Sequence, residues 1–391
     1  MDIDRHVVLV TLGALFAIGM ATDTLGRRLR LPRVTLLILF GALAGPVGFD
    51  VVPATVRGWY EFLATMALTM VAFLLGGELT LKSMRSHGRT IIVISLAVVC
   101  ITVAVVGAGL ALVGVALPVA LLIAGIATAT DPAATRDVIR QSRAEGPFSE
   151  TLQGIVAIDD AWGLIAFSLI LIVVNALVGN GVATVLEHAA WEFGGAVGVG
   201  VAVGVPAAYL SGRVQEGEPS QAEALAVVFL IAGLSEWLGV SFLMAGVVAG
   251  LIVVNCAKHH TRPFSAIEGM EYPFMVLFFF LAGASLQVDH GRAFAATITA
   301  YAAFRILSRA IGGWIGCRLS GAPAAWRPLT GLALLPQAGV AVGMALVASN
   351  HFPQYRDVIL PVAIGTTVLF EIFGPFATMI ALRRAGEARD G

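Results

Sequence analysis

Long apolar runs dominate the chain, and short stretches rich in charge, glycine or proline separate them. About thirteen of these runs approach the roughly 20 mostly apolar residues that a membrane-spanning helix needs. They lie at about 6–26, 32–47, 58–79, 90–114, 118–138, 151–178, 190–211, 221–236, 237–255, 270–287, 292–318, 327–349 and 357–382. The pattern therefore predicts an all-α membrane protein with about thirteen transmembrane helices.

Basic residues are unevenly distributed among the connecting segments. With the N-terminus outside, 18 of the 24 lysines and arginines fall in cytoplasmic loops and 4 in external loops, whereas Arg305 and Arg309 fall inside a span. Cytoplasmic loops carry such an excess in membrane proteins. Arginines between Arg27 and Arg33 follow the first run, which is the wrong polarity for a cleaved signal peptide. We expect a multi-pass protein of a bacterial inner membrane with an external N-terminus and a cytoplasmic C-terminus.

The composition and the motifs argue against several classes of function. Hydrophobic residues make up 58% of the 391 residues and charged residues 13%, which leaves too few polar side chains to cover a soluble domain. The net charge of −1 predicts no nucleic-acid partner. The expected partner is the membrane lipid that surrounds the protein. We find no nucleophile elbow, phosphate loop or metal motif. The sequence thus predicts neither an enzyme nor a cofactor, and it predicts one transporter unit without a soluble regulatory domain.

Two short motifs recur at nearly the same separation. The pattern F-L-x-G-x-x-L occurs at 73–79 and 280–286, and G-x-x-x-G occurs at 41–45 and 246–250. The offsets are 207 and 205 residues. Because the first copies of these motifs run in the opposite direction to the second, they predict inverted six-helix repeats. The repeats and their linker helix cover about 6–178, 221–382 and 190–211, respectively.

Matching helices of the two repeats carry interruptions. Asp131 precedes Pro132 near the middle of the fifth run, and a residue before proline disfavours helix. In the twelfth run, Pro336, Gln337 and Gly339 form a similar interruption. Broken helices are tolerated in a membrane only inside protein or beside a cavity. Paired interruptions in matching segments indicate the binding site of a transporter, where two broken helices cross.

Ionisable residues deep in a span indicate function because they are costly there. Asp159 and Asp160 are adjacent in an apolar helix and point about 100° apart. One of them can pair with a cation from another helix, while the other holds a proton or a metal ion. Arg305 lies at a similar depth, and Asp159 is its expected partner, with Asp160 and Asp131 as alternatives. Arg309 is one turn nearer the cytoplasm, where its side chain could reach the membrane surface.

Taken together, these residues resemble the monovalent cation:proton antiporter superfamily, the sodium/proton exchangers. The segment Ala129–Thr135 resembles the unwound helix of that family, and Asp159-Asp160 resembles the ion-binding pair of its two-aspartate branch. The endings at 370–375 and 382–387 also resemble family sequences. The resemblance implies the sodium/proton antiporter fold, with a core domain and a dimerisation domain, a homodimer and an elevator movement. It also implies that Asp160 carries the ion or proton.

The same resemblance implies that Asp159 partners the basic residue, and that Asp131 and Thr130 line the crossing site. One departure is Arg305, which stands where the branch often has lysine. Arginine stays protonated and cannot carry the proton. The resulting hypothesis is Na⁺ or Li⁺ exchange for H⁺ at a site for a monovalent cation built on Asp160 and Asp159. The alternatives are K⁺/H⁺ exchange at the same site, a sodium-coupled organic-solute symporter, and a channel.

Overall fold

Every regular element in the described part of the chain is a helix. The computed structural model describes residues 5–29, 33–46, 48–78, 88–178, 182–210, 220–257, 261–285, 292–337 and 339–388. The first half contains α1 (Arg5–Leu29), α2 (Arg33–Ala44), α3 (Ala54–Arg57), α4 (Tyr60–Glu78), α6 (Gly88–Leu112), α7 (Leu117–Ile126), α8 (Pro132–Gln141), α9 (Pro147–Val178) and α10 (Val182–Leu210). The second half contains α11 (Ser220–Leu238), α12 (Phe242–Cys256), α13 (Thr261–Ala284), α14 (Arg292–Ser320), η1 (Ala324–Trp326), α15 (Arg327–Ala333), α16 (Gly339–His351), η2 (Pro353–Tyr355) and α17 (Arg356–Arg384).

These helices reproduce the predicted order of spans. If α7 with α8, and α15 with α16, each count as one interrupted span, a helix lies in each of the predicted apolar runs. Among the described residues, eight helices are long and apolar enough to cross a membrane. The adjacent runs at about 221–236 and 237–255 are separated by a turn, because Gly239 has φ +64° between α11 and α12. The all-α membrane fold predicted from the hydropathy pattern is confirmed.

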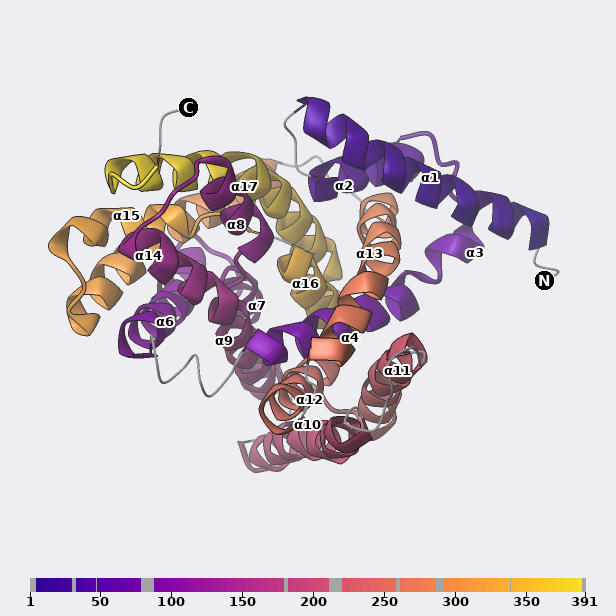
Figure 1. Ribbon diagram of the computed structural model, residues 1–391. Coiled ribbons are helices and arrows are strands. Elements are labelled where there is room, and N and C mark those ends of the chain that lie inside the picture. Colours follow the sequence, from indigo (N-terminus) through magenta and orange to yellow (C-terminus); the bar gives the residue numbers. More distant parts are fainter. Residues whose placement is uncertain are drawn as a thin grey trace.

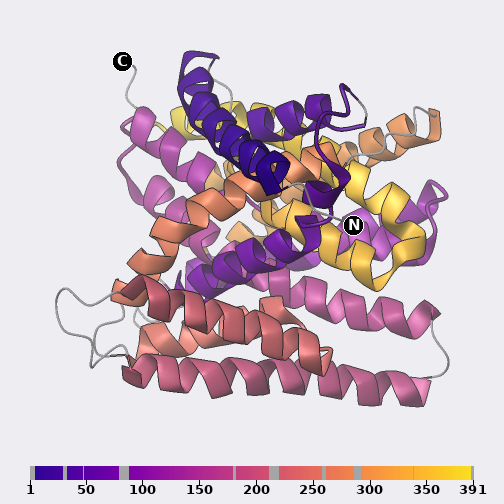
Figure 2. The same cartoon turned by 90° about the vertical axis from the view of Figure 1, so that its right-hand side faces the viewer.

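The helices pack into two groups: in Figure 1 one group occupies the left and centre, and the other lies to the right and below. We define the site group as α6, α7, α8, α9, α14, α15, α16 and α17, and the scaffold group as α1, α2, α3, α4, α10, α11, α12 and α13. Helices of each group pack mainly on one another. The groups meet where α9 touches α4, α10 and α12, where α16 touches α4, and where α17 touches α2. Figure 2 shows the long helix α10 at the lower edge, beneath α11 and α12.

Glycines of the recurring motifs bring helices of the scaffold group into backbone contact. A Cβ atom added at Gly41 of α2 would lie 2.0 Å from the carbonyl oxygen of Phe280 in α13. One added at Gly250 of α12 would lie 2.0 Å from the carbonyl oxygen of Phe73 in α4. Small residues permit such close approach between membrane helices. Each copy of one motif therefore packs on the opposite copy of the other.

The recurring motif extends beyond the described residues at one position in each copy. Leu79 and Leu286 lie outside the part of the chain that the structure describes. The repeat boundaries at about 6–178 and 221–382 stay a prediction.

The N-terminus of α9 is capped by a residue that follows α17. Glu387 accepts hydrogen bonds from the backbone N–H groups of Phe148 (2.8 Å) and Ser149 (2.7 Å). Gly386, at φ +76°, turns the chain back after α17 so that this carboxylate reaches α9. A carboxylate also complements the positive end of a helix dipole. The start of the helix that carries the aspartate pair is thus tied to the end of α17.

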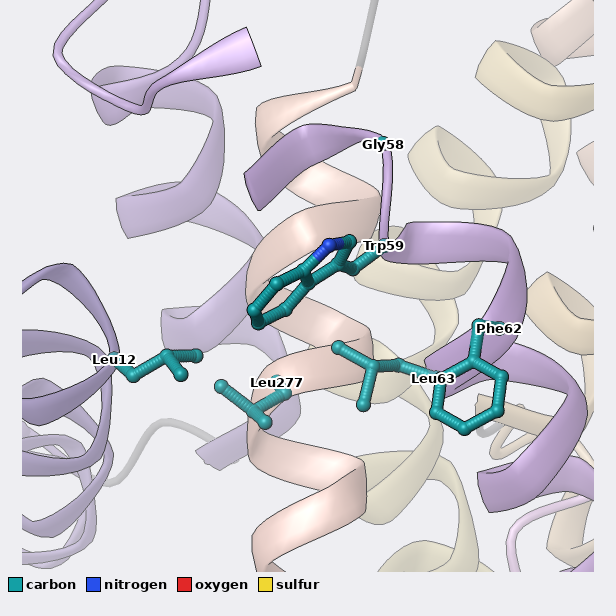
Figure 3. A pocket seen from close by; sticks show the side chains of 6 residues that line it. All are labelled: Leu12, Gly58, Trp59, Phe62, Leu63 and Leu277. Atoms are coloured by element: carbon teal, nitrogen blue, oxygen red, sulfur yellow. The ribbon is translucent and has the colours of Figure 1, made fainter. Parts of the chain in front are cut away.

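An apolar cavity of about 470 Å³ lies within the scaffold group. Figure 3 shows Leu12 of α1 facing Leu277 of α13, with Trp59 and the start of α4 on the other side. Its described lining carries no ionisable side chain. It is therefore distinct from the region of the aspartates.

Candidate ion-binding site

The first helix break forms where the Asp131-Pro132 pair predicts it. α7 ends at Ile126 and α8 starts at Pro132, so the backbone between them is not helical. Asp131 is extended, with φ −123° and ψ 93°, and its side chain accepts a hydrogen bond from the N–H of Ala134 at 2.9 Å. Asp131 is the N-cap of α8, a role for which aspartate is well suited.

The second break lies between α15 and α16. Leu335, Pro336 and Gln337 are non-helical, and α16 begins at Gly339. α17 lies close against this segment, since a Cβ atom added at Gly374 would be 2.5 Å from the Cα atom of Pro336. Each predicted interruption is therefore an actual gap between two helices.

Asp160 of α9 faces the first break. One of its carboxylate oxygens, Oδ1, accepts hydrogen bonds from the N–H of Thr130 at 2.8 Å and from its hydroxyl at 2.9 Å. Asp160 is 1% exposed, and Oδ2 has no hydrogen-bond partner among the described residues. A buried carboxylate oxygen without a partner is costly. Oδ2 is thus the point of the site at which a proton or a cation would be stabilised.

Asp159 faces a different set of neighbours. It is fully buried and accepts hydrogen bonds from the hydroxyl of Ser95 and from the guanidinium of Arg309, both at 3.0 Å. The predicted pairing of Asp159 with Arg305 is wrong, because Arg309 forms the ion pair. The adjacent carboxylates therefore differ, as the sequence predicted: Asp159 has a fixed cation, whereas Asp160 has hydrogen-bond donors alone.

Arg309 is fully buried, so the expectation that its side chain would reach the membrane surface is also wrong. Its second terminal nitrogen donates to the carbonyl oxygens of Ala127 (3.1 Å), Thr128 (2.5 Å) and Ala129 (3.2 Å). These carbonyls follow the end of α7 and have no helical partner. They and Asp159 hold the arginine inside the protein.

Arg305 joins the two breaks instead of pairing with Asp159. It donates to Ala127 (3.3 Å) and Ala129 (2.8 Å) in the first break, and to Leu335 (2.7 Å) and Pro336 (3.5 Å) in the second. Its guanidinium carbon lies 4.4 Å from the centre of the Phe370 ring, a cation–π contact. Carbonyl oxygens at the C-terminal ends of two half-helices attract a positive charge. Arg305 therefore acts as a fixed cation that links the breaks.

Gln337 of the second break is held between two neighbouring helices. Its Oε1 accepts a hydrogen bond from the hydroxyl of Tyr301 at 3.1 Å, and its Nε2 donates to the hydroxyl of Thr367 at 3.3 Å. Tyr301 lies one turn before Arg305 on α14. The second break is thus fixed by polar bonds to both α14 and α17.

Comparison with known proteins agrees with this arrangement. The family model described as sodium/hydrogen exchanger, transmembrane, matches residues 12–383. The chain belongs to the sodium/hydrogen exchanger family. Among solved structures it is similar to the sodium proton antiporter MjNhaP1 from Methanocaldococcus jannaschii at pH 8, with 19% identity and a TM-score of 0.76. That match covers 98% of this chain and 100% of the other. No curated protein sequence matches the chain.

This exchanger is accordingly a multi-pass membrane protein that exchanges cations for protons, and its fold is that of the known antiporter. Several polar contacts of its site are not evident from the sequence. Ser95, Tyr301 and Thr367 carry hydroxyl groups in apolar helices, where nothing in the sequence separates a site contact from a hydroxyl bonded to its own helix. Their partners lie on other helices, so only the packing reveals them.

Proposed function

We propose that this exchanger moves Na⁺ or Li⁺ in one direction and H⁺ in the other at Asp160, one ion for one proton. The observation that carries the proposal is the buried, unpartnered Oδ2 atom of Asp160 beside the first helix break. A proton or a small cation bound there would supply the missing partner. Because both bind the same carboxylate, they would compete, and competition couples the two fluxes.

The charges around the site favour a ratio of one to one. Asp131, Asp159 and Asp160 with Arg305 and Arg309 carry one net negative charge when all five are ionised. One proton or one monovalent cation brings this sum to zero, and a neutral site crosses a low-dielectric barrier most easily. The arginines keep their protons, and Asp159 is held by one of them. Asp160 is the residue left to exchange its ligand.

Few oxygen atoms near Asp160 are available to coordinate the cation. Arg305 and Arg309 already occupy the carbonyl oxygens of Ala127, Thr128 and Ala129. The cation would then bind Asp160 and other oxygens near it, with water completing its shell. Asp131 and Thr130 border this position. The apolar cavity of the scaffold group includes none of these residues, so it is separate from the position of this cation.

We also propose the oligomeric state, the membrane orientation and the movement of the protein. We expect a homodimer in a bacterial inner membrane, with the N-terminus outside and the C-terminus in the cytoplasm. The site group would move against the scaffold group in an elevator-like step. These expectations follow from the distribution of basic residues and from the family resemblance.

The test is exchange by purified protein in liposomes that contain a pH-sensitive dye. Gradients of Na⁺, Li⁺ and K⁺ are imposed in turn at several clamped membrane voltages. We expect Na⁺ and Li⁺ to drive proton movement at a rate that does not depend on voltage, and Asp160→Asn to abolish it. Asp137→Asn is the matched control, because Asp137 lies exposed on α8 and pairs with Arg140. Faster exchange with K⁺ would favour the alternative cation, and a steep voltage dependence would contradict the ratio of one to one.

A further inference from the structure

A buried carboxylate outside the ion site joins the two helix groups. Glu371 of α17 accepts a hydrogen bond of 2.7 Å from the hydroxyl of Thr35 in α2. Thr35 is 0% exposed and Glu371 is 2% exposed. The two residues are 336 positions apart in the sequence. The bond lies at the α2–α17 contact, one of the places where the site group meets the scaffold group.

α17 is firmly attached to the second helix break on the site side of this bond. Phe370, the neighbour of Glu371, packs under the guanidinium of Arg305. Gly374, three residues further on, packs on Pro336, and Thr378 donates to the carbonyl of Ala333 at 3.0 Å. A displacement of the second break would therefore carry Glu371 with it. Thr35 belongs to the scaffold group and would stay behind.

Exchange requires such a displacement. Asp160 is 1% exposed, so the arrangement described here gives the ion no open path to either side. Transporters of inverted-repeat design open by moving one group of helices largely as a rigid body against the other. An O–H···O hydrogen bond needs a donor–acceptor distance of about 2.5–3.0 Å, and the present distance is 2.7 Å. The Thr35–Glu371 bond can thus persist in some arrangements of the groups and must break in others.

We propose that Glu371 is a positioning residue for exchange, and that its bond with Thr35 stabilises the present arrangement of the groups relative to the alternatives. This inference rests on the proposed function. A second polar contact between the groups, the pair of Arg356 with Glu61 at 3.5 Å, is largely exposed and is correspondingly weak. The buried bond is the stronger of the two, because water does not compete for it.

The bond predicts a specific kinetic signature. The apparent affinity on each face of the membrane equals the intrinsic affinity multiplied by the fraction of protein open to that face. We expect the bond to persist in the arrangement that opens to one face and to break in the arrangement that opens to the other, so weakening it changes these fractions in opposite directions. A hydrogen bond to a carboxylate shifts such an equilibrium by a factor of about ten or more. The ratio of the external to the internal KM for Na⁺ should therefore change by about tenfold, whereas a variant that is merely less stable lowers the rate and leaves the ratio unchanged.

The experiment measures the Na⁺ KM on both faces, in right-side-out and inside-out vesicles. Thr35→Val removes the donor and keeps the shape, so we expect the ratio of the two KM values to shift. Thr35→Ser retains the hydroxyl and should restore the wild-type ratio. Thr69→Val is the matched control, because Thr69 is also buried in the scaffold group but donates within α4, to the carbonyl of Thr65. It should leave the ratio unchanged.

Glu371→Gln separates the bond from the charge. The amide oxygen still accepts from Thr35, so the ratio should shift less than in Thr35→Val. An unchanged ratio in Thr35→Val, an equal shift in Thr69→Val, or a larger shift in Glu371→Gln would each overturn the inference. If Thr35→Val does not insert, failure of Thr35→Ser to keep the wild-type ratio overturns it equally. Wild-type exchange of Na⁺ for protons tests the proposed function separately, because it does not depend on any of these variants.

Discussion

The pairing of Asp159 with Arg309 leads to a prediction about stability that can be tested without transport. Arg309→Met removes the guanidinium that lies 3.0 Å from the carboxylate of Asp159. Asp159 then stays buried, and among the described residues the hydroxyl of Ser95 remains as its hydrogen-bond donor. Breaking one side of a buried ion pair costs about 3–5 kcal/mol. Asp159→Asn leaves Arg309 as the uncompensated charge, so it should cost a similar amount.

The double variant should cost clearly less than the sum of the two single ones. Removing both partners leaves neither charge buried alone, and residues in direct contact show interaction energies of about 0.5–3 kcal/mol. With about 2.1 cal/mol/K of unfolding entropy per residue, each single variant should lower the melting temperature by about 4–6 °C. The assay is thermal unfolding of the purified protein in detergent, followed by intrinsic fluorescence at one protein concentration.

The refuting result involves Arg305. It bonds to backbone carbonyls, not to Asp159, so Arg305→Met and Asp159→Asn should be closer to additive. If the cycle with Arg305 shows the larger coupling, or if the cycle with Arg309 is additive, the assignment of the ion pair fails. The comparison is informative because both arginines are buried on the same helix, one turn apart.

Three further outcomes follow from the site and its supports. If protons and the cation compete for Asp160 as proposed, lowering the pH by one unit should raise the apparent KM for Na⁺ about tenfold where Asp160 is mostly protonated, and the maximal rate at saturating Na⁺ should be largely kept. Initial rates across a pH series measure this, and a constant KM would contradict it. Arg305→Lys keeps the charge but loses the planar set of donors that reaches both breaks. We therefore expect a lower melting temperature and a slower maximal rate in the liposome assay. Wild-type values for both would show that the charge alone is sufficient. Glu387→Ala removes the cap of α9 and should cost about 0.5–2 kcal/mol of stability, seen as a lower thermal midpoint; Glu387→Gln, which keeps one acceptor oxygen, should lose less, and the reverse order would contradict the cap.

The sequence was most informative about features set by local chemistry. Asp131 before Pro132 predicted a break at that point because the backbone there cannot continue a helix, and the structure has the break. Asp159 and Asp160 predicted two different environments because adjacent helical residues point apart. These conclusions require no knowledge of how the helices pack.

The partners of buried groups could not be found in the same way. Arg305 and Arg309 lie on one face of α14, and the sequence does not tell which turn of that face meets α9. The answer depends on where the carbonyl oxygens after Ile126 lie relative to α14. Arg305 bonds to these oxygens and to those of the second break, and not to Asp159. Glu371 is likewise buried against Thr35, which lies 336 positions away in the chain. Such contacts depend on the relative axial positions of helices, which hydropathy does not encode.

The backbone contacts at the motif glycines affect how this sequence can vary during evolution. Side chains that face lipid can exchange one apolar residue for another with little consequence, because the solvent around them is equally apolar. Gly41 and Gly250 have no such freedom, since even a methyl group would collide with a carbonyl oxygen of the next helix. A substitution there would have to separate two helices along their length. In the scaffold group, we therefore expect the fewest tolerated substitutions at the glycines where the backbones of two helices are in direct contact.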